Sequence, residues 1–307
     1  MDRDSSELSS ASSAPSEELD DHVTDNLSGL SEAELEGLGV RCAARPSLVY
    51  NAKNARTAAR NSANRAQEHM WSSDMLVRHL NMLKSFASPN VAGAQLWTDA
   101  FLFRVKAMLD CTDNGLVLSL QQFLDVPVHS KTVLSGFVAY ALFMGPKDLT
   151  EQYFPSSDLR LERNRDGLCL FIDEAEETDV PLKCFLPQTV GKMFAGMKAM
   201  EKDFIRGGLT NGHNWMFIIL EADASGTGAV YHYTDEFSLL ASINPIPYSS
   251  ASLKPSPLKE RCDVVAAVIS GWVEKSHCKL DKSDVFTYGA VEEERNEEET
   301  LEYIGAE

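Results

Sequence analysis

The apolar side chains divide the chain into a mainly helical first part and a second part that forms a sheet. Between residues 66 and 145, most apolar positions recur at the three- and four-residue spacing of a helix. Pro89 and Gly93 separate two such helices. A further short helix is predicted over residues 116–124 and ends before Pro127. The helical positions are Met75, Leu76, His79, Leu80 and Leu83, then Leu96, Phe101, Val105, Met108 and Leu109.

From residue 133 onward the pattern becomes typical of strands. Residues 133–144 are β-branched and aromatic, and residues 158–164 alternate between apolar and polar. Apolar runs predict further strands over 167–173, 214–222 and 228–237, and helical spacing returns over 187–204 and 258–278. The residues between 207 and 213 read as a turn. This order predicts an α/β fold in which helices pack one mixed sheet.

Both ends of the chain are acidic, and the part between them is nearly neutral. The net charge of the 307 residues is -18; residues 1–40 carry 11 acidic and one basic side chain, and residues 290–307 carry eight and one. Residues 1–40 are also rich in Ser and lack aromatic residues, so we expect a disordered tail. Within it, Ser31 and Glu34 could cap a short helix over 31–37. The expected organisation is a single domain over 41–289, with a helical part (41–130) and a sheet core with a closing helix (131–289), followed by an acidic tail.

The composition points to a protein that works inside the cell. None of the six cysteines forms a CxxC pair, so we expect reduced thiols. The first residues have no apolar signal-peptide region, and no apolar run has the length of a membrane helix. The predicted location is therefore cytoplasmic or nuclear, with no membrane partner.

A basic segment follows the acidic start of the chain. Residues 41–65 contain six Lys or Arg and no acid, and Lys53, Arg56 and Arg60 are spaced to share one helical face. Two interpretations stay open. The face contacts nucleic-acid phosphates, or it is a solvated surface whose charge balances the acidic tail.

One arrangement of polar residues stands out in the second part. The strand over 167–173 runs into Glu174, Ala175 and Glu176; a helix then begins at Pro187 and Gln188, and the sequence LTNGHNW (209–215) leads into the next strand. Over about residues 133–235, this ordered combination resembles the PD-(D/E)XK nuclease superfamily, in particular its fungal-type group. The resemblance implies a restriction-endonuclease-like mixed sheet flanked by helices, with an N-terminal helical region.

The resemblance also assigns roles to individual residues. In such sites two carboxylates hold Mg²⁺, which polarises the phosphate and activates a water molecule, and a lysine stabilises the developing charge. Glu174 fits the metal-binding Glu, and Glu176 replaces the lysine while sharing a face of the strand with Glu174. Gln188 fits the helix Gln that supports the site, and Lys192 lies one turn further along that helix.

Two residues compete for the position of the upstream acid. Aligning residues 133–144 with the corresponding strand of the family puts Ala139 there, before Tyr140, and alanine cannot bind a cation. Asp158 would instead supply the acid from an adjacent strand.

These residues lead to three functional hypotheses. The first is a nuclease-like module with weak or lost phosphodiesterase activity that binds nucleic acid or protein. The second is an active Mg²⁺-dependent nuclease that uses Asp158, Glu174 and Glu176, with Gln188 in support. The third is a protein-interaction scaffold built on the basic segment and acidic tails. The expected partners are DNA, RNA or another protein, and the resemblance also implies a homodimer.

Overall fold

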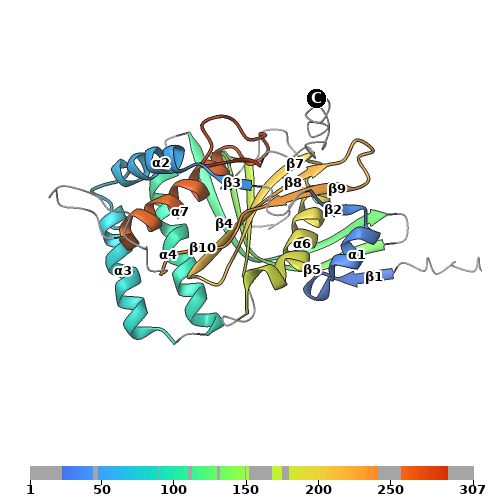
Figure 1. Ribbon diagram of the computed structural model, residues 1–307, viewed down its shortest axis with the longest axis horizontal. Coiled ribbons are helices and arrows are strands. Elements are labelled where there is room, and N and C mark those ends of the chain that lie inside the picture. Colours follow the sequence, from blue (N-terminus) through green and yellow to red (C-terminus); the bar gives the residue numbers. More distant parts are fainter. Residues whose placement is uncertain are drawn as a thin grey trace, which may run out of the picture.

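A mixed β-sheet forms the centre of the molecule and carries helices on both faces (Figure 1). The computed structural model describes residues 23–43, 48–88, 90–109, 113–129, 132–148, 150–151, 168–174, 180–240 and 257–289. Within this part of the chain the sheet has nine strands in the order β1-β5-β6-β7-β8-β9-β2, with β4 paired to β5 and β10 paired to β8. The strands are β1 (Val23–Asn26), β2 (Val40–Cys42), β4 (Asn114–His129), β5 (Thr132–Pro146), β6 (Leu168–Glu174), β7 (Phe204–Thr210), β8 (Asn214–Ala222), β9 (Ala229–Tyr233) and β10 (Phe237–Ser238).

The helices cover the two faces of the sheet unequally (Figure 1). The helices are α1 (Glu32–Gly37), α2 (Ala52–Asn64), α3 (Ser73–Phe86), α4 (Val91–Leu109), α6 (Leu186–Ala199) and α7 (Pro257–Glu274), with short 3-10 turns η1 (Leu27–Gly29) and η3 (Leu182–Phe185). On one face, α6, η1 and α1 enclose a core with Phe171 and Phe194. On the other, α2, α3, α4 and α7 enclose a core with Ile172, Trp215 and Trp272. A small second sheet pairs β3 (Leu48–Tyr50) with β11 (Phe286–Tyr288).

Strands β4 and β5 form a long antiparallel hairpin that corrects one prediction. Residues 116–124 were expected to be helical, but they lie in β4 and pair with β5. Val117 is buried toward α6, while Leu116 and Leu118 pack toward the opposite core. Both faces of the strand are covered only at the start of this run, so Leu116, Val117 and Leu118 are all apolar and show no two-residue alternation. The positive φ of Gln121, 51°, further interrupts the alternation.

The first elements of the chain correct a second prediction. Residues 23–40 were included in the expected disordered tail, yet they form β1, η1, α1 and the start of β2. Helix α1 has the predicted capping box. The Ser31 hydroxyl accepts a hydrogen bond from the backbone N–H of Glu34, and the Glu34 carboxylate accepts one from the backbone N–H of Ser31. Leu27 and Leu35 are fully buried against the α6 core. The expected boundary at residue 41 therefore falls within packed structure, and the part over 41–130 that was expected to be helical also contains strands β2, β3 and β4. Residues 1–22 and 290–307 lie outside the described residues.

Most of the predicted sheet and its helices are confirmed. Strands β5, β6, β8 and β9 and helices α6 and α7 appear where their apolar patterns placed them. Strand β7 was missed because its two glycines suggested a turn, although all its residues are buried. The strand predicted over 158–164 lies outside the described residues. In the part of the chain that the structure describes, no helix combines the length and apolar character needed to cross a membrane.

Candidate functional site

Glu174 is the last residue of β6, and its side chain lies beneath helix α4. Only 8% of the residue is exposed. The Tyr140 hydroxyl on β5 donates a hydrogen bond to its Oε1 atom at 3.1 Å. The side chains of Gln95 and Thr98 on α4 also lie beside the carboxyl group, where they lower its pKa; the Thr98 hydroxyl donates to the Ala94 carbonyl oxygen at 3.2 Å. Neutral polar side chains from two elements thus surround a carboxyl group at the end of a central strand.

A second carboxyl group lies on the same side of the sheet. Asp99, on α4, is half-buried and hydrogen-bonds to Tyr140, so the phenol bridges Asp99 and Glu174. Burial raises the pKa of Glu174 to about 6, and it also raises the pKa of Asp99. Burial and the two neighbouring carboxyl groups raise the pKa of Tyr140, which keeps this phenol protonated as a donor. We call Asp99, Tyr140 and Glu174 the acid site.

The turn between β7 and β8 holds α4 over the acid site. The Asn211 side chain accepts hydrogen bonds from the backbone N–H groups of His213 and Asn214. Gly212 has a φ of 82°, and a Cβ atom there would lie 2.7 Å from the Ala94 carbonyl oxygen. Only glycine permits both this backbone conformation and this close approach to the helix. The LTNGHNW sequence therefore acts on the site indirectly, by placing α4.

Asp173 belongs to a different cluster, on the opposite face of the sheet. Successive strand residues point to opposite faces, so Asp173 faces α6 while Glu174 faces α4. Lys192 on α6 lies 2.9 Å from both carboxylate oxygens of Asp173, and the Thr189 hydroxyl donates to it at 3.1 Å. Both side chains are buried, so the ammonium group of Lys192 pairs with Asp173 and does not reach Glu174 on the opposite face.

The structure therefore does not bring together all the predicted site residues. Gln188 lies on α6, one turn before Lys192, and its buried Nε2 atom has no hydrogen-bond partner among the described residues. Both residues are on the far side of the sheet from Glu174. Ala139 is partly buried and packs on the α4 side next to Tyr140, where it offers no ligand. Asp158 and Glu176 lie outside the described residues.

The acid site does not fit a resident Mg²⁺ ion well. Mg²⁺ is bound by ionised oxygen ligands with near-octahedral geometry. Here burial favours the protonated form of both carboxyl groups, and Oε1 of Glu174 already accepts a hydrogen bond from Tyr140. Among the described residues, no group of three or more His, Cys, Asp or Glu side chains is arranged to hold a metal ion.

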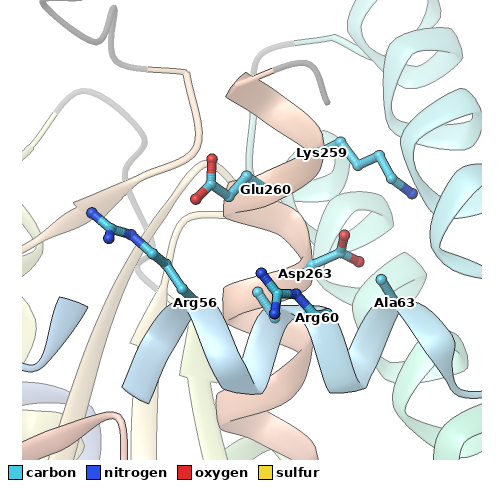
Figure 2. Close-up of a pocket in the computed structure, with 7 residues that line it drawn as sticks. Arg56, Arg60, Ala63, Lys259, Glu260 and Asp263 are labelled. Carbon is cyan, nitrogen blue, oxygen red and sulfur yellow. The ribbon is translucent and has the colours of Figure 1, made fainter. Parts of the chain in front are cut away.

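The basic face predicted from the sequence lies on α2, in a layer outside the sheet. Lys53, Arg56 and Arg60 are all on this helix, which packs against α7, and α7 in turn packs on β5 and β6. Arg56 and Arg60 line a pocket of about 310 Å³ between α2 and the start of α7 (Figure 2). Lys259, Glu260 and Asp263 of α7 line its other side, so cations and carboxylates face one another there.

Two of the charged side chains on the α7 side of this pocket already have partners outside it. Lys259 lies 2.5 Å from Asp74, and the buried Asp263 accepts a hydrogen bond from the Ser73 hydroxyl at 2.6 Å. None of the residues lining the pocket contributes to the acid site. The structure thus separates the basic face from Glu174.

Sequence reasoning missed the three residues that α4 contributes around Glu174. Gln95, Thr98 and Asp99 are polar positions in a helix that is otherwise mostly apolar on its inner face. Thr98 is completely buried, which is unusual for a polar side chain unless it has a hydrogen-bond partner. Polar residues within the apolar pattern of this helix were the sequence signal from which these three positions could have been found. No protein-family model matches the chain, and no curated protein matches it in sequence.

Proposed function

We propose that this chain is a PD-(D/E)XK nuclease-like protein that binds nucleic acid and whose phosphodiesterase activity is weak or lost. The observation that carries the proposal is the environment of Glu174. The carboxyl group lies at the end of a central strand, as the resemblance implies, but the neutral side chains of Tyr140, Gln95 and Thr98 surround it. The mixed sheet with helices on both faces supports the same assignment.

The charges around Glu174 explain why hydrolysis would be slow. Cleavage of a phosphodiester by such a site needs a cation to polarise the phosphate and to stabilise the developing charge. The groups that most strongly shift the pKa of Glu174 include no Lys or Arg. Lys192 is buried with Asp173 on the other face of the sheet, so it does not supply the missing charge.

An active Mg²⁺-dependent nuclease is the second candidate, and Asp99 favours it. Asp99 supplies a second carboxyl group beside Glu174, which the sequence suggested only through Asp158. In an active enzyme these groups would ionise and bind the metal together with Glu176. The phosphate of the substrate would then be a further ligand.

A combined binding and cleavage assay tests the proposal. The full chain is mixed with fluorescent DNA and RNA, single-stranded and duplex, with Mg²⁺ or Mn²⁺ present or absent. We expect a rise in fluorescence anisotropy on binding and intact nucleic acid on a denaturing gel. The same assay is run on Glu174→Ala and on Glu68→Ala, a control that removes an exposed acid.

Two results would contradict the proposal. Metal-dependent cleavage that Glu174→Ala abolishes and Glu68→Ala preserves would show an active nuclease. An absence of binding to every nucleic acid would exclude the binding role, and would leave a protein-interaction scaffold as the remaining hypothesis.

A further inference from the structure

The basic face of α2 carries positive charges that the described part of the chain does not pair. Lys53, Arg56 and Arg60 are all exposed, and within the described residues no carboxylate forms an ion pair with any of them. We propose that the acidic tail, residues 290–307, docks on this face and shields it from other anions. This contact does not depend on whether the chain binds nucleic acid.

Little in the described structure offsets the charges of the basic face. Helix α2 contains no acidic residue, and Arg56 and Arg60 are four positions apart, a spacing at which like charges repel each other. Two acids line the pocket beside them, Glu260 and Asp263. Asp263 is buried and accepts a hydrogen bond from Ser73, and Figure 2 shows the guanidinium group of Arg56 pointing away from it. A segment rich in carboxylates would therefore relieve the repulsion along this face.

Strand β11 brings the start of the acidic tail close to the first turn of α2. Tyr288 is directly opposite Leu48 in the ladder between β11 and β3. The backbone N–H of Asn51, the N-cap of α2, donates to the Val285 carbonyl oxygen at 2.8 Å. The residues that follow β11 therefore leave the described structure beside the helix that carries the basic face.

The acidic tail is long enough to cover the basic face. Leu48 precedes Lys53 by five residues, which is at most roughly 17 Å, and the segment of α2 from Lys53 to Arg60 adds roughly 10 Å. The nine residues from Tyr288 to Glu297 span up to roughly 30 Å. The glutamates from Glu297 onward therefore come within reach of every cation of the face.

Charge and position favour this tail over other anions. Residues 290–307 carry eight acids and one base. Residues 1–22 are also acidic, but they lead into β1, which lies on the opposite side of the molecule from α2 (Figure 1). A tethered segment has an effective concentration on the order of millimolar, so ion pairs that are individually weak can still form. The tail of a second copy lacks this advantage and is a competing outcome of the test.

Carbodiimide cross-linking of the full chain tests the contact, because this reagent joins a lysine ammonium group to a carboxylate that touches it. We expect mass spectrometry to find links between Lys53 and the glutamates of the acidic tail. Salt at about 1 M, which shortens the screening length to roughly 3 Å, should abolish them. Arg56→Gln with Arg60→Gln should lower their yield by about threefold or more. Arg78→Gln with Lys84→Gln, which removes two exposed cations from α3, is the matched control and should leave the yield unchanged.

Elution from a heparin column, which presents a polyanion, tests the shielding. Replacing the glutamates at 292–294 and 297–299 with Gln in the full chain should raise the salt concentration needed for elution. The rise should be much smaller when Arg56→Gln and Arg60→Gln are also present, because the shielded cations are then absent. It should persist in full beside Arg78→Gln and Lys84→Gln. Circular dichroism confirms that each variant is folded.

Several results would overturn the proposal. An absence of links to Lys53 at low salt, or an equal yield in the two double variants, would show that the acidic tail does not dock on the basic face. Links that join two chains, detected in a mixture of isotope-labelled and unlabelled protein, would assign the contact to self-association. An equal rise in heparin binding in both backgrounds would exclude shielding. None of these results bears on the nucleic-acid assay, so the two proposals fail separately.

Discussion

At the scale of single residues, the acid site depends on where two neighbouring carboxyl groups point. Asp173 and Glu174 are adjacent in β6, and the strand sends one to α6 and the other to α4. Asp173 forms an ion pair with Lys192. Glu174 instead accepts a hydrogen bond from a neutral phenol and lies close to a second carboxyl group. The first is a buried ion pair with a structural role. The second is a carboxyl group whose pKa is raised to about 6 by burial.

The raised pKa of Glu174 predicts how stability changes with pH. The pKa is about 6 in the folded chain, against an ordinary value of 4.5, so between these pH values the folded state binds more protons than the unfolded state. Ionisation of Glu174 therefore removes stability as the pH rises through this window. Glu174→Gln abolishes that loss. The free energy of unfolding of the variant, measured relative to that of the native chain, should therefore rise by about 1 kcal/mol between pH 5 and pH 8.

Urea denaturation at the two pH values measures this difference. Glu68→Gln is the matched control, since it removes an exposed carboxyl group that lies outside the acid site. A Glu174→Gln variant whose stability relative to the native chain does not change with pH would show that Glu174 titrates normally.

At the scale of elements, close contact between α6 and β6 is the feature most sensitive to side-chain size. Gly196 on α6 lies against the ring of Phe171, which is 1% exposed, and a Cβ atom at Gly196 would lie 2.3 Å from its Cε2 atom. On α7, Gly271 has no heavy atom within 4 Å of the corresponding position. The two glycines thus have opposite structural roles in their helices.

Alanine substitution should separate these roles. Gly196→Ala inserts a methyl group into a packed core and should lower the free energy of unfolding by about 1–3 kcal/mol. Gly271→Ala adds no clash and should raise it by about 0.5–1 kcal/mol, since alanine favours the helix. Thermal and urea unfolding measure both effects. Equal effects of the two variants would contradict the described packing of α6 on β6.

The sequence revealed elements with an uninterrupted apolar pattern more readily than elements whose pattern is interrupted. Strands β5, β6 and β8 and helices α6 and α7 followed from their patterns. Strands β4 and β7 did not, because Ser119, Gln121 and Gln122 interrupt the apolar positions of β4 and because two adjacent glycines in β7 suggest a turn. The same limit applies to the site. Glu174 ends a recognisable strand, whereas Asp99 reaches it only through the packing of α4, which no local pattern records.

At the scale of the whole molecule, the N-terminal segment is part of the core. Leu27, Leu30, Leu35, Leu38 and Val40 are all buried on the α6 side. Burying each such side chain contributes about 1.5–3 kcal/mol. Their sum is comparable with the roughly 5–15 kcal/mol that stabilises a typical domain. The acidic, Ser-rich composition concealed this contribution.

Two truncated chains should therefore behave differently. A chain that begins at residue 23 keeps all these contacts, so we expect a cooperative thermal transition close to that of the full chain. A chain that begins at residue 41 lacks them and should be unfolded or aggregated. Circular dichroism and size-exclusion chromatography distinguish the two. A cooperative fold for the chain beginning at residue 41 would show that the segment over 23–40 is dispensable.

We propose that the acid site keeps the position of a nuclease site without its metal chemistry. Calorimetric titration of Mg²⁺ and of Mn²⁺ into the full chain tests it most directly, with Glu174→Ala and Glu68→Ala titrated in parallel. The predicted result is that Glu174→Ala changes neither metal titration. Metal binding that Glu174→Ala abolishes and Glu68→Ala leaves intact would contradict the claim and would identify an intact metal site at Glu174.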